Sequence, residues 1–302
     1  MNEALAVIIP VHNRASETKA CLECLQKQTV DGVRIVVVDD GSTDGTQEML
    51  EQEFPDVVRL EGDGNLWWTG AINMGVRDAL GQNADLIITL NNDVLIKEDY
   101  IQRLMDAHEE YPEAIIGSIN LTQEEPPRLL DAGIVSHNPW TAKYVKRGER
   151  LQRYDGEFEG LLSTYSLPGR GVLIPRAVFE TVGLYDEQGF PHYAADLDFS
   201  LRAAEAGFSL FVHAENPVYS PYEPDRAGGR GQSFFAFAKS FFAFRSSNYL
   251  PVLVRFNYRH CPAKPFFLVF FGMDLLRTII SFVRNKLIMR SRYKNPAREN
   301  RE

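Results

Sequence analysis

The chain has 302 residues, and its 32 basic and 41 acidic residues give a formal net charge of −9 at neutral pH. With 44% hydrophobic and 24% charged residues it has an ordinary globular composition, which excludes a disordered, collagen-like or disulfide-scaffold chain. The charge is unevenly placed, because residues 239–302 contain 13 basic and three acidic residues and so carry +10, which leaves −19 for residues 1–238. This asymmetry indicates an acidic globular body and a basic, apolar tail that prefers an anionic surface.

Three cysteines, two of them spaced as Cys21-x-x-Cys24, predict a reducing compartment. Such a pair can be a redox or metal motif, but both cysteines fall with Leu25 on one face of an expected helix, which favours small apolar core residues. The first ten residues contain no basic region ahead of their apolar stretches, so we predict no signal peptide.

Short β-branched runs alternate with amphipathic segments from Ala4 to about Asn120, a pattern typical of a parallel sheet covered by helices. Asp44, with Gln47 three residues later, predicts the start of the second helix. We predict strands at Leu5–Pro10, Arg34–Asp39, Val57–Leu60, Leu86–Leu90 and Ala114–Ile119, and helices near Ser16–Gln28, Thr46–Phe54, Gly70–Leu80 and Glu98–Tyr111.

The periodicity weakens from about Pro126 to Gly160, where we expect loops with room for a hairpin. Beyond it we predict a strand at Val172–Ile174, a helix beginning near Pro175, a helix at Phe199–Ala206 that ends at Gly207, and a loop at Pro221–Gln232.

Polar residues follow three of the predicted strands. The first strand leads into Pro10-Val11-His12-Asn13-Arg14, the second into Asp39-Asp40-Gly41-Ser42 and the fourth into Asn91-Asn92-Asp93. Ligands of parallel sheets bind beyond the carboxyl ends of the strands, so these residues predict one binding site on that rim.

Four motifs together resemble the nucleotide-sugar glycosyltransferases of family 2, which have the GT-A fold. They read VIIPVHNR, VVVDDGSTDGT, LNNDV and the pair PGRG and ADLDFSLR, in unbroken order between Ala4 and Val218. The segment Gly64–Ala71 is similar to a branch that includes bacterial rhamnosyltransferases and other surface-polysaccharide enzymes.

The resemblance implies an α/β fold of the GT-A type, Rossmann-like, with a mixed, mostly parallel sheet flanked by helices and a helical C-terminal appendage. We expect a catalytic domain at residues 1–218, with a nucleotide half at 1–120 and an acceptor half at 121–218. Residues 219–302 would form the basic, apolar appendage.

A carboxylate at a strand end suits recognition of a pyrimidine base, whose ring N–H it can accept. Asp39 is the first candidate and Asp40 the second, although Asp40-Gly41-Ser42 read alone is an ordinary turn. The predicted nucleotide-binding residues are Pro10, Val11, Asn13, Arg14, Asp39, Asp40, Asn91 and Asn92.

The diphosphate needs positive charge, which an acidic body can supply as a metal ion. Asn91-Asn92-Asp93 occupies the place of the family's Asp-x-Asp motif, so the resemblance implies Asp93 as ligand of Mg²⁺ or Mn²⁺. Many relatives add a His after the strand that follows the catalytic helix. This chain reads Tyr219-Ser220 there, and the nearest His213 is expected to be structural.

The resemblance makes Asp196 the general base that takes a proton from the acceptor hydroxyl. The competing interpretation is a helix N-cap. One base and one metal describe an inverting single displacement, unlike the paired carboxylates of glycoside hydrolysis. The predicted acceptor- or sugar-binding residues are Trp67, Trp68, Gly169, Arg170 and Asp198. Core packing is an equal alternative for the tryptophans, and a surface role for Arg170.

The tail contains a mostly apolar run, Pro265–Val283, with Asp274 and Arg277 near its middle. Each charge costs about 2.5–3.5 kcal/mol on insertion, which disfavours a spanning helix. The basic residues that follow favour an amphipathic helix lying on an anionic membrane surface. The alternatives are packing on the catalytic domain and a homodimer interface.

The sequence therefore predicts an inverting glycosyltransferase that transfers a sugar from a dTDP- or UDP-linked donor to a polysaccharide or lipid-linked acceptor. We expect it in the cytoplasm, peripheral on the inner face of the cell membrane, and expect no nucleic-acid partner. The alternatives are a nucleotidyltransferase, which would need a Gly-rich basic loop after the first strand, and an inactive nucleotide-sugar-binding relative.

Overall fold

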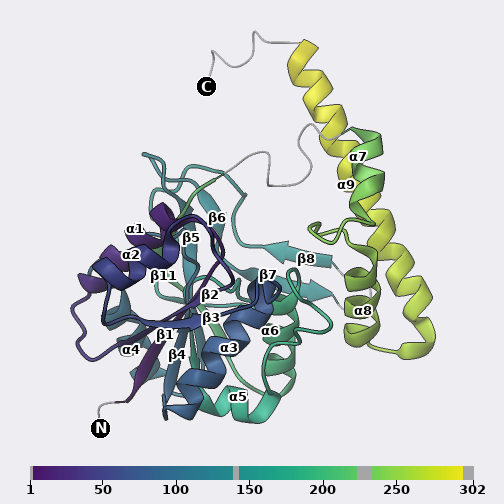
Figure 1. Ribbon diagram of the computed structural model, residues 1–302. Helices are drawn as coiled ribbons and strands as arrows, with labels where there is room; N and C mark the ends of the chain where they lie inside the picture. The colour runs from purple at the N-terminus through teal and green to yellow at the C-terminus, as the bar shows by residue number, and fades with distance from the viewer. Residues whose placement is uncertain (1–2, 139–142, 223–232, 295–302) are drawn as a thin grey trace. The chain divides into compact units, whose positions relative to one another are not determined.

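The computed structural model of the protein describes residues 3–138, 143–222 and 233–294 (Figure 1). Its contacts divide the chain into two compact units. The first comprises Met1–Ser136 and Val145–Pro221, and the second comprises His137–Tyr144 and Tyr222–Glu302. The boundary near Pro221 lies three residues beyond the predicted one, and the grouping of residues 137–144 with the C-terminal unit was not predicted.

The first unit is built on a mixed sheet with the strand order β3-β2-β1-β4-β10-β5-β11-β9, with β6 paired to β5. Strands β1, β2, β3 and β4 are mutually parallel, as are β5 and β11, whereas β10 runs antiparallel to both β4 and β5. The strands are β1 (Leu5–Val11), β2 (Arg34–Asp39), β3 (Val58–Glu61), β4 (Leu86–Thr89), β5 (Ile115–Thr122), β6 (Leu129–Asp131), β9 (Leu161–Ser163), β10 (Val172–Pro175) and β11 (Leu210–Ser220). The predicted fold class is confirmed.

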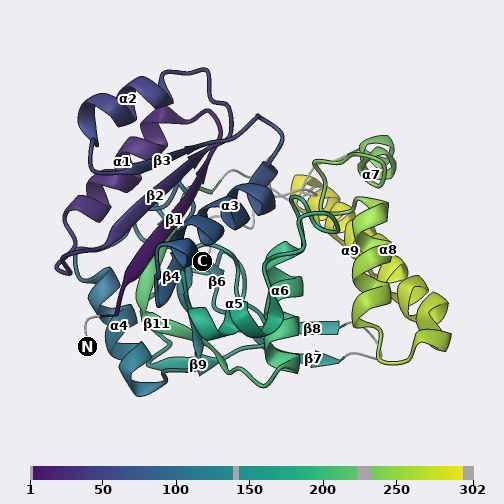
Figure 2. The same cartoon turned by 60° about the horizontal axis from the view of Figure 1, so that its bottom comes forward.

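Helices cover the sheet, and Figure 2 shows α1 and α2 on one face of β1–β3 with α3 on the other. The helices of this unit are α1 (Ala15–Gln26), α2 (Thr46–Glu53), α3 (Trp67–Gly81), α4 (Tyr100–Glu110), α5 (Arg176–Val182) and α6 (Ala195–Glu205). All six were predicted, but α3 and α6 begin three and four residues earlier than expected, so Trp67 and Asp196 lie inside helices.

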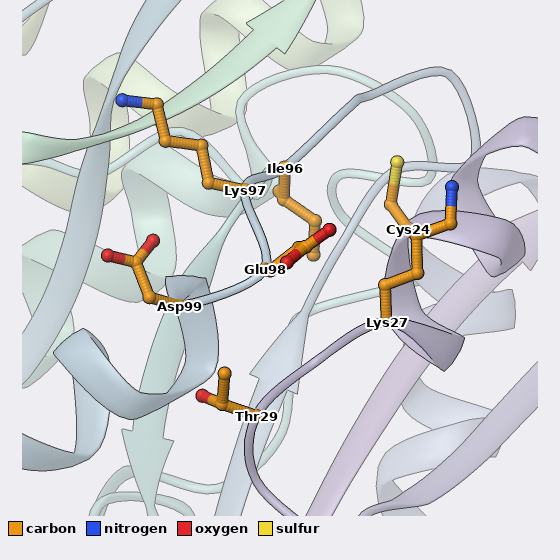
Figure 3. A pocket seen from close by; sticks show the side chains of 7 residues that line it. All are labelled: Cys24, Lys27, Thr29, Ile96, Lys97, Glu98 and Asp99. Atoms are coloured by element: carbon orange, nitrogen blue, oxygen red, sulfur yellow. The ribbon is translucent and has the colours of Figure 1, made fainter.

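A surface hollow of about 580 Å³ lies between the C-terminal end of α1 and the loop before α4. Lys27 and Lys97 extend from its opposite walls, and Glu98 lies between them (Figure 3). The hollow is at the opposite end of α1 from the residues that follow β1, so it is not part of the predicted site.

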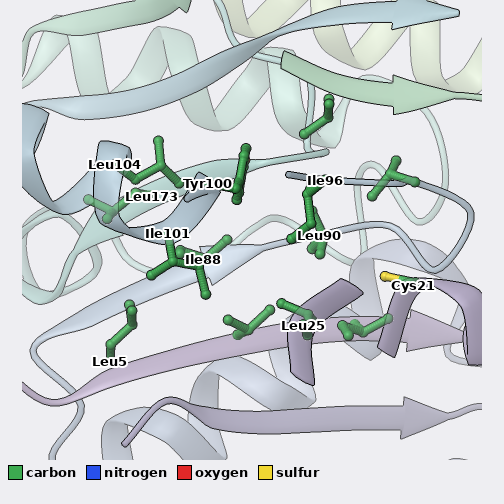
Figure 4. Packing of buried hydrophobic residues seen from close by; sticks show 14 of the residues in the cluster. Leu5, Cys21, Leu25, Ile88, Leu90, Ile96, Tyr100, Ile101, Leu104 and Leu173 are labelled. Carbon is green, nitrogen blue, oxygen red and sulfur yellow. The ribbon is translucent and has the colours of Figure 1, made fainter. Parts of the chain in front are cut away.

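The core explains why the strands are apolar on both faces. Val7 and Ile9 of β1 belong to a buried cluster with α1 and α4, which Figure 4 shows around Leu25 and Ile88. The intervening Ile8 faces α3, where a Cβ on Gly75 would lie 2.3 Å from its side chain. Burial on both faces is what a continuous β-branched strand requires.

Cys21 is a core residue, as predicted, and Cys24 packs against the same core cluster. All three are free thiols, and Cys21 and Cys261 are buried while Cys24 is half-buried. Burial raises the pKa of the Cys21 thiol, which keeps it protonated and unreactive.

The second unit is helical. It contains α7 (Phe234–Ser240), α8 (Leu250–His260), a 3₁₀ turn η1 (Lys264–Phe266) and α9 (Phe267–Lys294). Within the segment where a hairpin was expected, β7 (Ile134–Asn138) and β8 (Lys143–Lys146) pair in a two-stranded sheet. Beyond Tyr222, the predicted loop Pro221–Gln232 lies outside the described residues.

Among the described residues, one segment is long and apolar enough to cross a membrane, namely Lys264–Arg284 with mean hydropathy 1.9. Only 11% of its apolar window is buried inside the protein. Asp274, near the middle of this segment, accepts a hydrogen bond from Nδ2 of Asn257 in α8 at 2.9 Å and lies 3.7 Å from Arg277.

Candidate active site

The loops that follow β1 and β2 are joined to each other by hydrogen bonds. The N–H of Asn13 donates to Oγ of Ser42, and Oδ1 of Asn13 accepts from the N–H of Thr43, both at 2.8 Å. The N–H of Arg14 donates to Oδ2 of Asp44 at 2.5 Å. Asn13 and Arg14 have positive φ values of 48° and 125°. The two loops therefore hold the backbone in a conformation that residues other than glycine rarely adopt.

Asp44 was predicted only as the start of α2, but its carboxylate accepts hydrogen bonds from the first residues of both α1 and α2. Its Oδ1 accepts from Oγ1 of Thr46 at 2.6 Å, and its Oδ2 accepts from the N–H of Ala15, the first residue of α1, at 2.8 Å. Partial desolvation opposes the change, but these hydrogen bonds outweigh it and lower the pKa of Asp44. The residue directly before α2 is Gly45, with φ 90°.

The two carboxylates that end β2 differ in what they bind. Both oxygens of Asp40 are occupied by loop backbone, with Gly64 N–H at 2.8 Å and Trp67 N–H at 3.1 Å. Asp39 accepts one backbone hydrogen bond, from Ser42 at 3.0 Å, and its Oδ2 is 3.8 Å from Arg59. The geometry therefore gives Asp40 the role of ordering the loop before α3, and recognition of the nucleotide base by Asp39 stays a prediction.

The tryptophan pair has two different roles. Nε1 of Trp68 donates to Oδ1 of Asn91 at 3.1 Å, and its ring meets Tyr185 edge-on at 5.6 Å. A Cβ on Gly169 would lie 2.2 Å from this ring, so residue 169 lacks a side chain because Trp68 packs there. Trp67, with φ 57°, lies beside His192 at 5.7 Å instead.

These contacts correct two site predictions. Trp68 is a packing residue that joins α3 to the Asn91 loop, so the acceptor role stays a prediction for Trp67 alone. Asn92 is 8% exposed and its Nδ2 donates to Oγ1 of Thr18 at 2.9 Å, which anchors α1. Because that amide is occupied inside the protein, Asn92 is poorly placed to bind a nucleotide.

Asp93 is the one carboxylate of the Asn-Asn-Asp motif, and it is paired with an arginine. Nη1 of Arg14 lies 2.6 Å from Oδ2 of Asp93. Oδ1 of Asp93 is buried and has no hydrogen-bond partner among the described residues. The loops after β1 and β4 therefore meet at a charge-assisted hydrogen bond.

The unpartnered Oδ1 of Asp93 is the kind of hard oxygen that Mg²⁺ or Mn²⁺ takes as a ligand. The described part of the chain has no group of three or more His, Cys, Asp or Glu side chains that could hold a metal ion. The residues therefore fit a metal that is bound through one carboxylate, with substrate phosphates and water as further ligands.

Ser220 stands near the position where the resemblance to the family implies a histidine. It ends β11 and is buried, and its Oγ has no hydrogen-bond partner among the residues described. Nε2 of Gln123 donates to the carbonyls of both Asp93 and Tyr219, at 3.3 and 3.2 Å. Gln123 thus links the end of β11, where Ser220 lies, to the Asp93 loop. His213 lies seven residues earlier in β11, and burial lowers its pKa, as expected of a structural histidine.

Asp196, the predicted base, is the second residue of α6. Its Oδ2 accepts a hydrogen bond from the N–H of Gly169 at 3.3 Å, and its Oδ1 accepts from the N–H of Leu197 at 2.9 Å. Burial raises the pKa of Asp196, and the two hydrogen bonds and the charge of Arg170 only partly offset that effect. A raised pKa brings a carboxylate closer to the value that suits a general base.

The N-cap interpretation of Asp196 is wrong. The capping position is Ala194, with φ 66°, and no side chain caps this helix end. Arg170, predicted to contact acceptor or phosphate, is half-buried, and its charge reaches the Asp196 carboxylate.

Asp198 does not face the site. It is fully buried, and its Oδ2 accepts from Nε of Arg202 at 2.9 Å. The same guanidinium donates to the carbonyls of Val182 and Leu184 at 2.6 and 2.9 Å. The predicted sugar contact of Asp198 is therefore corrected to a packing role that holds α6 to the end of α5.

Comparison with known proteins agrees with this fold. A sequence model of the family described as glycosyl transferase family 2 matches residues 6–183. The chain belongs to glycosyl transferase family 2, and it is a glycosyltransferase. The family assignment replaces the nucleotidyltransferase alternative.

Two of the curated relatives are bacterial glycosyltransferases. The chain is 30% identical over 238 residues to an N-acetylglucosaminyl-diphospho-decaprenol L-rhamnosyltransferase of Mycobacterium tuberculosis, covering 70% of this chain and 74% of the relative. It is 26% identical to glycosyltransferase GlyG of Streptococcus pneumoniae, covering 69% of this chain and 68% of the relative.

Solved structures support the GT-A fold. The chain superimposes on GalNAc-T7, crystallised with UDP, GalNAc and Mn²⁺, with a TM-score of 0.60 at 14% identity, covering 90% of this chain and 57% of that one. It superimposes on S. aureus TarS with a TM-score of 0.53, covering 87% of this chain and 44% of that one. The chain thus spans little more than half of GalNAc-T7.

Proposed function

We propose that the protein transfers a sugar, with inversion, from a dTDP- or UDP-linked donor to a hydroxyl of a polysaccharide or lipid-linked acceptor. The observation that carries the proposal is the environment of Asp196, a partly enclosed carboxylate with a raised pKa at the start of α6. The relatives named as glycosyltransferases, among them an L-rhamnosyltransferase acting on a polyprenyl-diphosphate-linked sugar, support the substrate class.

The proposed reaction needs one proton transfer. The acceptor oxygen attacks the anomeric carbon and its proton passes to the Asp196 carboxylate, while the bond from that carbon to the diphosphate oxygen breaks and its electron pair leaves with the nucleoside diphosphate. The N–H groups of Gly169 and Leu197 each donate to one oxygen of Asp196, and together they hold the carboxylate in a fixed orientation. Asp39 would accept the base N–H, and a cation at Asp93 would supply positive charge for the diphosphate.

Replacing Asp196 by Asn tests the base. We expect kcat to fall about 10²- to 10⁴-fold because the amide cannot accept the proton, while the nucleotide still binds. Asp31→Asn, an exposed position in the loop between α1 and β2, is the matched control. Retained turnover in Asp196→Asn would remove the assignment of the base.

Release of nucleoside diphosphate from a panel of dTDP- and UDP-sugars, with polyprenyl-diphosphate-linked acceptors, tests the substrate class. Donor-dependent release with a lipid-linked acceptor supports the proposal. Nucleotide-sugar binding without release for any donor would instead support an inactive binding relative.

The C-terminal unit supports a peripheral membrane location. Val269, Met273, Leu276, Ile280 and Val283 recur at spacings of four and three residues on α9, and their side chains are 40–62% exposed. We call these five residues the α9 strip. A strip this regular and exposed indicates an interaction surface.

The rest of α9 explains why the strip faces outward. Asp274 is satisfied within the unit by Asn257, and Phe282 stacks on Phe237 of α7 at 4.0 Å. The exposed Arg284 and Lys286 follow the strip. An apolar face bordered by basic side chains suits an anionic bilayer, in which each cation gains about 1 kcal/mol.

Flotation of the full chain with phosphatidylglycerol vesicles tests this location. The double change Leu276→Asp and Ile280→Asp should abolish flotation, whereas Val145→Asp, at an exposed apolar position of β8, should not. Unchanged flotation of the double variant would contradict the membrane role of the strip. A dimer in solution that this variant dissociates, with no flotation of the wild type, would assign the strip to a homodimer.

A further inference from the structure

The pairing of Arg14 with Asp93 affects how a metal ion would bind to the Asp93 carboxylate. The guanidinium already neutralises the only carboxylate of the motif, through a contact of 2.6 Å to Oδ2. Oδ1 of the same carboxylate is left buried and unpartnered among the described residues. One oxygen is therefore held by a permanent cation and the other is available to a second cation.

The backbone of Arg14 is held in place by hydrogen bonds from neighbouring loops, and this directs its side chain toward Asp93. Its φ of 125° is a strained value for a residue with a side chain. The strain is maintained by Asp44, which accepts the Arg14 N–H at 2.5 Å, and by the Asn13 contacts to Ser42 and Thr43. Strained residues held by several neighbours cluster at functional sites.

Charge decides what the two oxygens can bind at the same time. A divalent ion at Oδ1 would lie close to the Arg14 guanidinium, and two cations repel each other strongly where water is partly excluded. The single carboxylate of Asp93 supplies one negative charge, whereas the guanidinium and a divalent ion together carry three positive charges. A nucleoside diphosphate adds negative charge at the same place, so both cations are accommodated once the nucleotide is bound.

We propose that Arg14 is the resident counter-ion of Asp93 and couples metal binding to nucleotide binding. In the free protein Arg14 opposes a divalent ion at Asp93, and in the nucleotide-bound protein it becomes a contact of the diphosphate. The inference rests on the proposed function, because it concerns the donor site of that reaction. Through this contact, Arg14 makes the metal bind together with the nucleotide, and only weakly before the nucleotide is bound.

Mn²⁺ binding, measured by loss of the free-ion signal in electron paramagnetic resonance, tests the proposal without relying on activity. The wild-type chain is titrated with Mn²⁺ alone and with saturating UDP or dTDP. We expect the nucleotide to tighten Mn²⁺ binding at least about tenfold, within the usual range of coupling between sites. Arg14→Gln should bind Mn²⁺ alone about tenfold more tightly than the wild type, with a smaller gain from nucleotide.

Arg34→Gln is the matched control. Arg34 pairs with Asp78 at 3.0 Å, and the side-chain exposures of this pair, 35% and 21%, resemble the 30% and 20% of Arg14 and Asp93. This variant should bind Mn²⁺ as the wild type does. Asp93→Asn should lose Mn²⁺ binding with and without nucleotide.

Two results would overturn the proposal. One is equal affinity of the wild type and Arg14→Gln for Mn²⁺ alone, and the other is a wild-type affinity that nucleotide does not change. The second needs no variant, so it decides the matter even if Arg14→Gln does not fold. A chain that binds neither UDP nor dTDP would contradict the proposed function, while the comparison with Mn²⁺ alone would still test the role of Arg14.

Discussion

The indole ring of Trp68 packs on the α-carbon of Gly169 so closely that a Cβ at residue 169 would lie 2.2 Å from Cζ2 of the ring. The same glycine donates its N–H to Asp196. Trp68 is in turn bonded to Asn91, so one packing contact joins the loop after β4 to the start of α6. The loop after β4 and the loop that holds Asp196 are thereby positioned by one side chain.

Gly169→Ala should therefore damage both stability and turnover. The added methyl group overpacks the Trp68 contact, which costs about 1–3 kcal/mol of unfolding free energy. Displacement of the backbone also weakens the hydrogen bond to Asp196, so kcat should fall as well. Urea denaturation and steady-state kinetics measure the two effects. Gly81→Ala, where the methyl group meets nothing within 4 Å, is the control and should be nearly neutral.

The ion pair of the buried Asp198 with the half-buried Arg202 makes a different prediction. Asp198→Ala leaves a guanidinium with two carbonyl partners and no counter-charge, so the unfolding free energy should fall by about 3–5 kcal/mol. Any protein that still folds should keep its KM for the acceptor, because Asp198 is fully buried. A folded variant with wild-type stability and a raised acceptor KM would restore the original interpretation of Asp198 as a sugar contact.

The strands and helices of the first unit could be predicted because its pattern is local. Runs such as Arg34–Asp39 are apolar on both faces and end in polar residues, and the structure has the same strand. The starts of α3 and α6 were missed because Trp67 and Ala194 enter their helices with positive φ, which carries no sequence signal in residues other than glycine. Periodicity gives no tertiary partners either, so it could not separate Trp67 from Trp68.

The candidate site at the carboxyl ends of the strands was predictable from the sequence, but the interaction partners of its residues were not. Asn92 and Asp198 stand in the motifs of the family, yet their side chains bind Thr18 and Arg202 inside the protein. Motif position identifies which loop enters the site, whereas the direction of each side chain depends on contacts with distant segments. The Arg14 contact to Asp93, across 79 residues of sequence, is of this kind.

Asp44→Ala tests the joint between the two loops. Loss of the hydrogen bonds to the first N–H groups of α1 and to Thr46 should cost about 1 kcal/mol, the usual value for a helix cap. The pKa of Asp44 is lowered in the folded protein, so its contribution is present above the unfolded pKa and is lost as pH falls through the folded pKa. The stability difference between wild type and variant, measured by urea denaturation across acid pH, should therefore shrink in that range. A constant difference would show that the carboxylate charge is not involved.

The pKa of Asp196 is shifted in the opposite direction from that of Asp44. Burial raises its pKa, so the folded state holds the proton more tightly than the unfolded chain, and the stabilising contribution of the protonated form is lost as pH rises from the unfolded to the folded pKa. Above the folded pKa, the ionised carboxylate is thus retained at a cost in stability. Asp196→Asn should consequently unfold at a higher temperature than the wild type at neutral pH, while it loses turnover. The wild-type kcat/KM should rise with pH along a limb set by the raised pKa, because only the ionised form accepts the proton. Thermal unfolding of both proteins at acid and neutral pH provides the check, and a variant that is less stable than the wild type at neutral pH would show that hydrogen bonding to Gly169 outweighs desolvation.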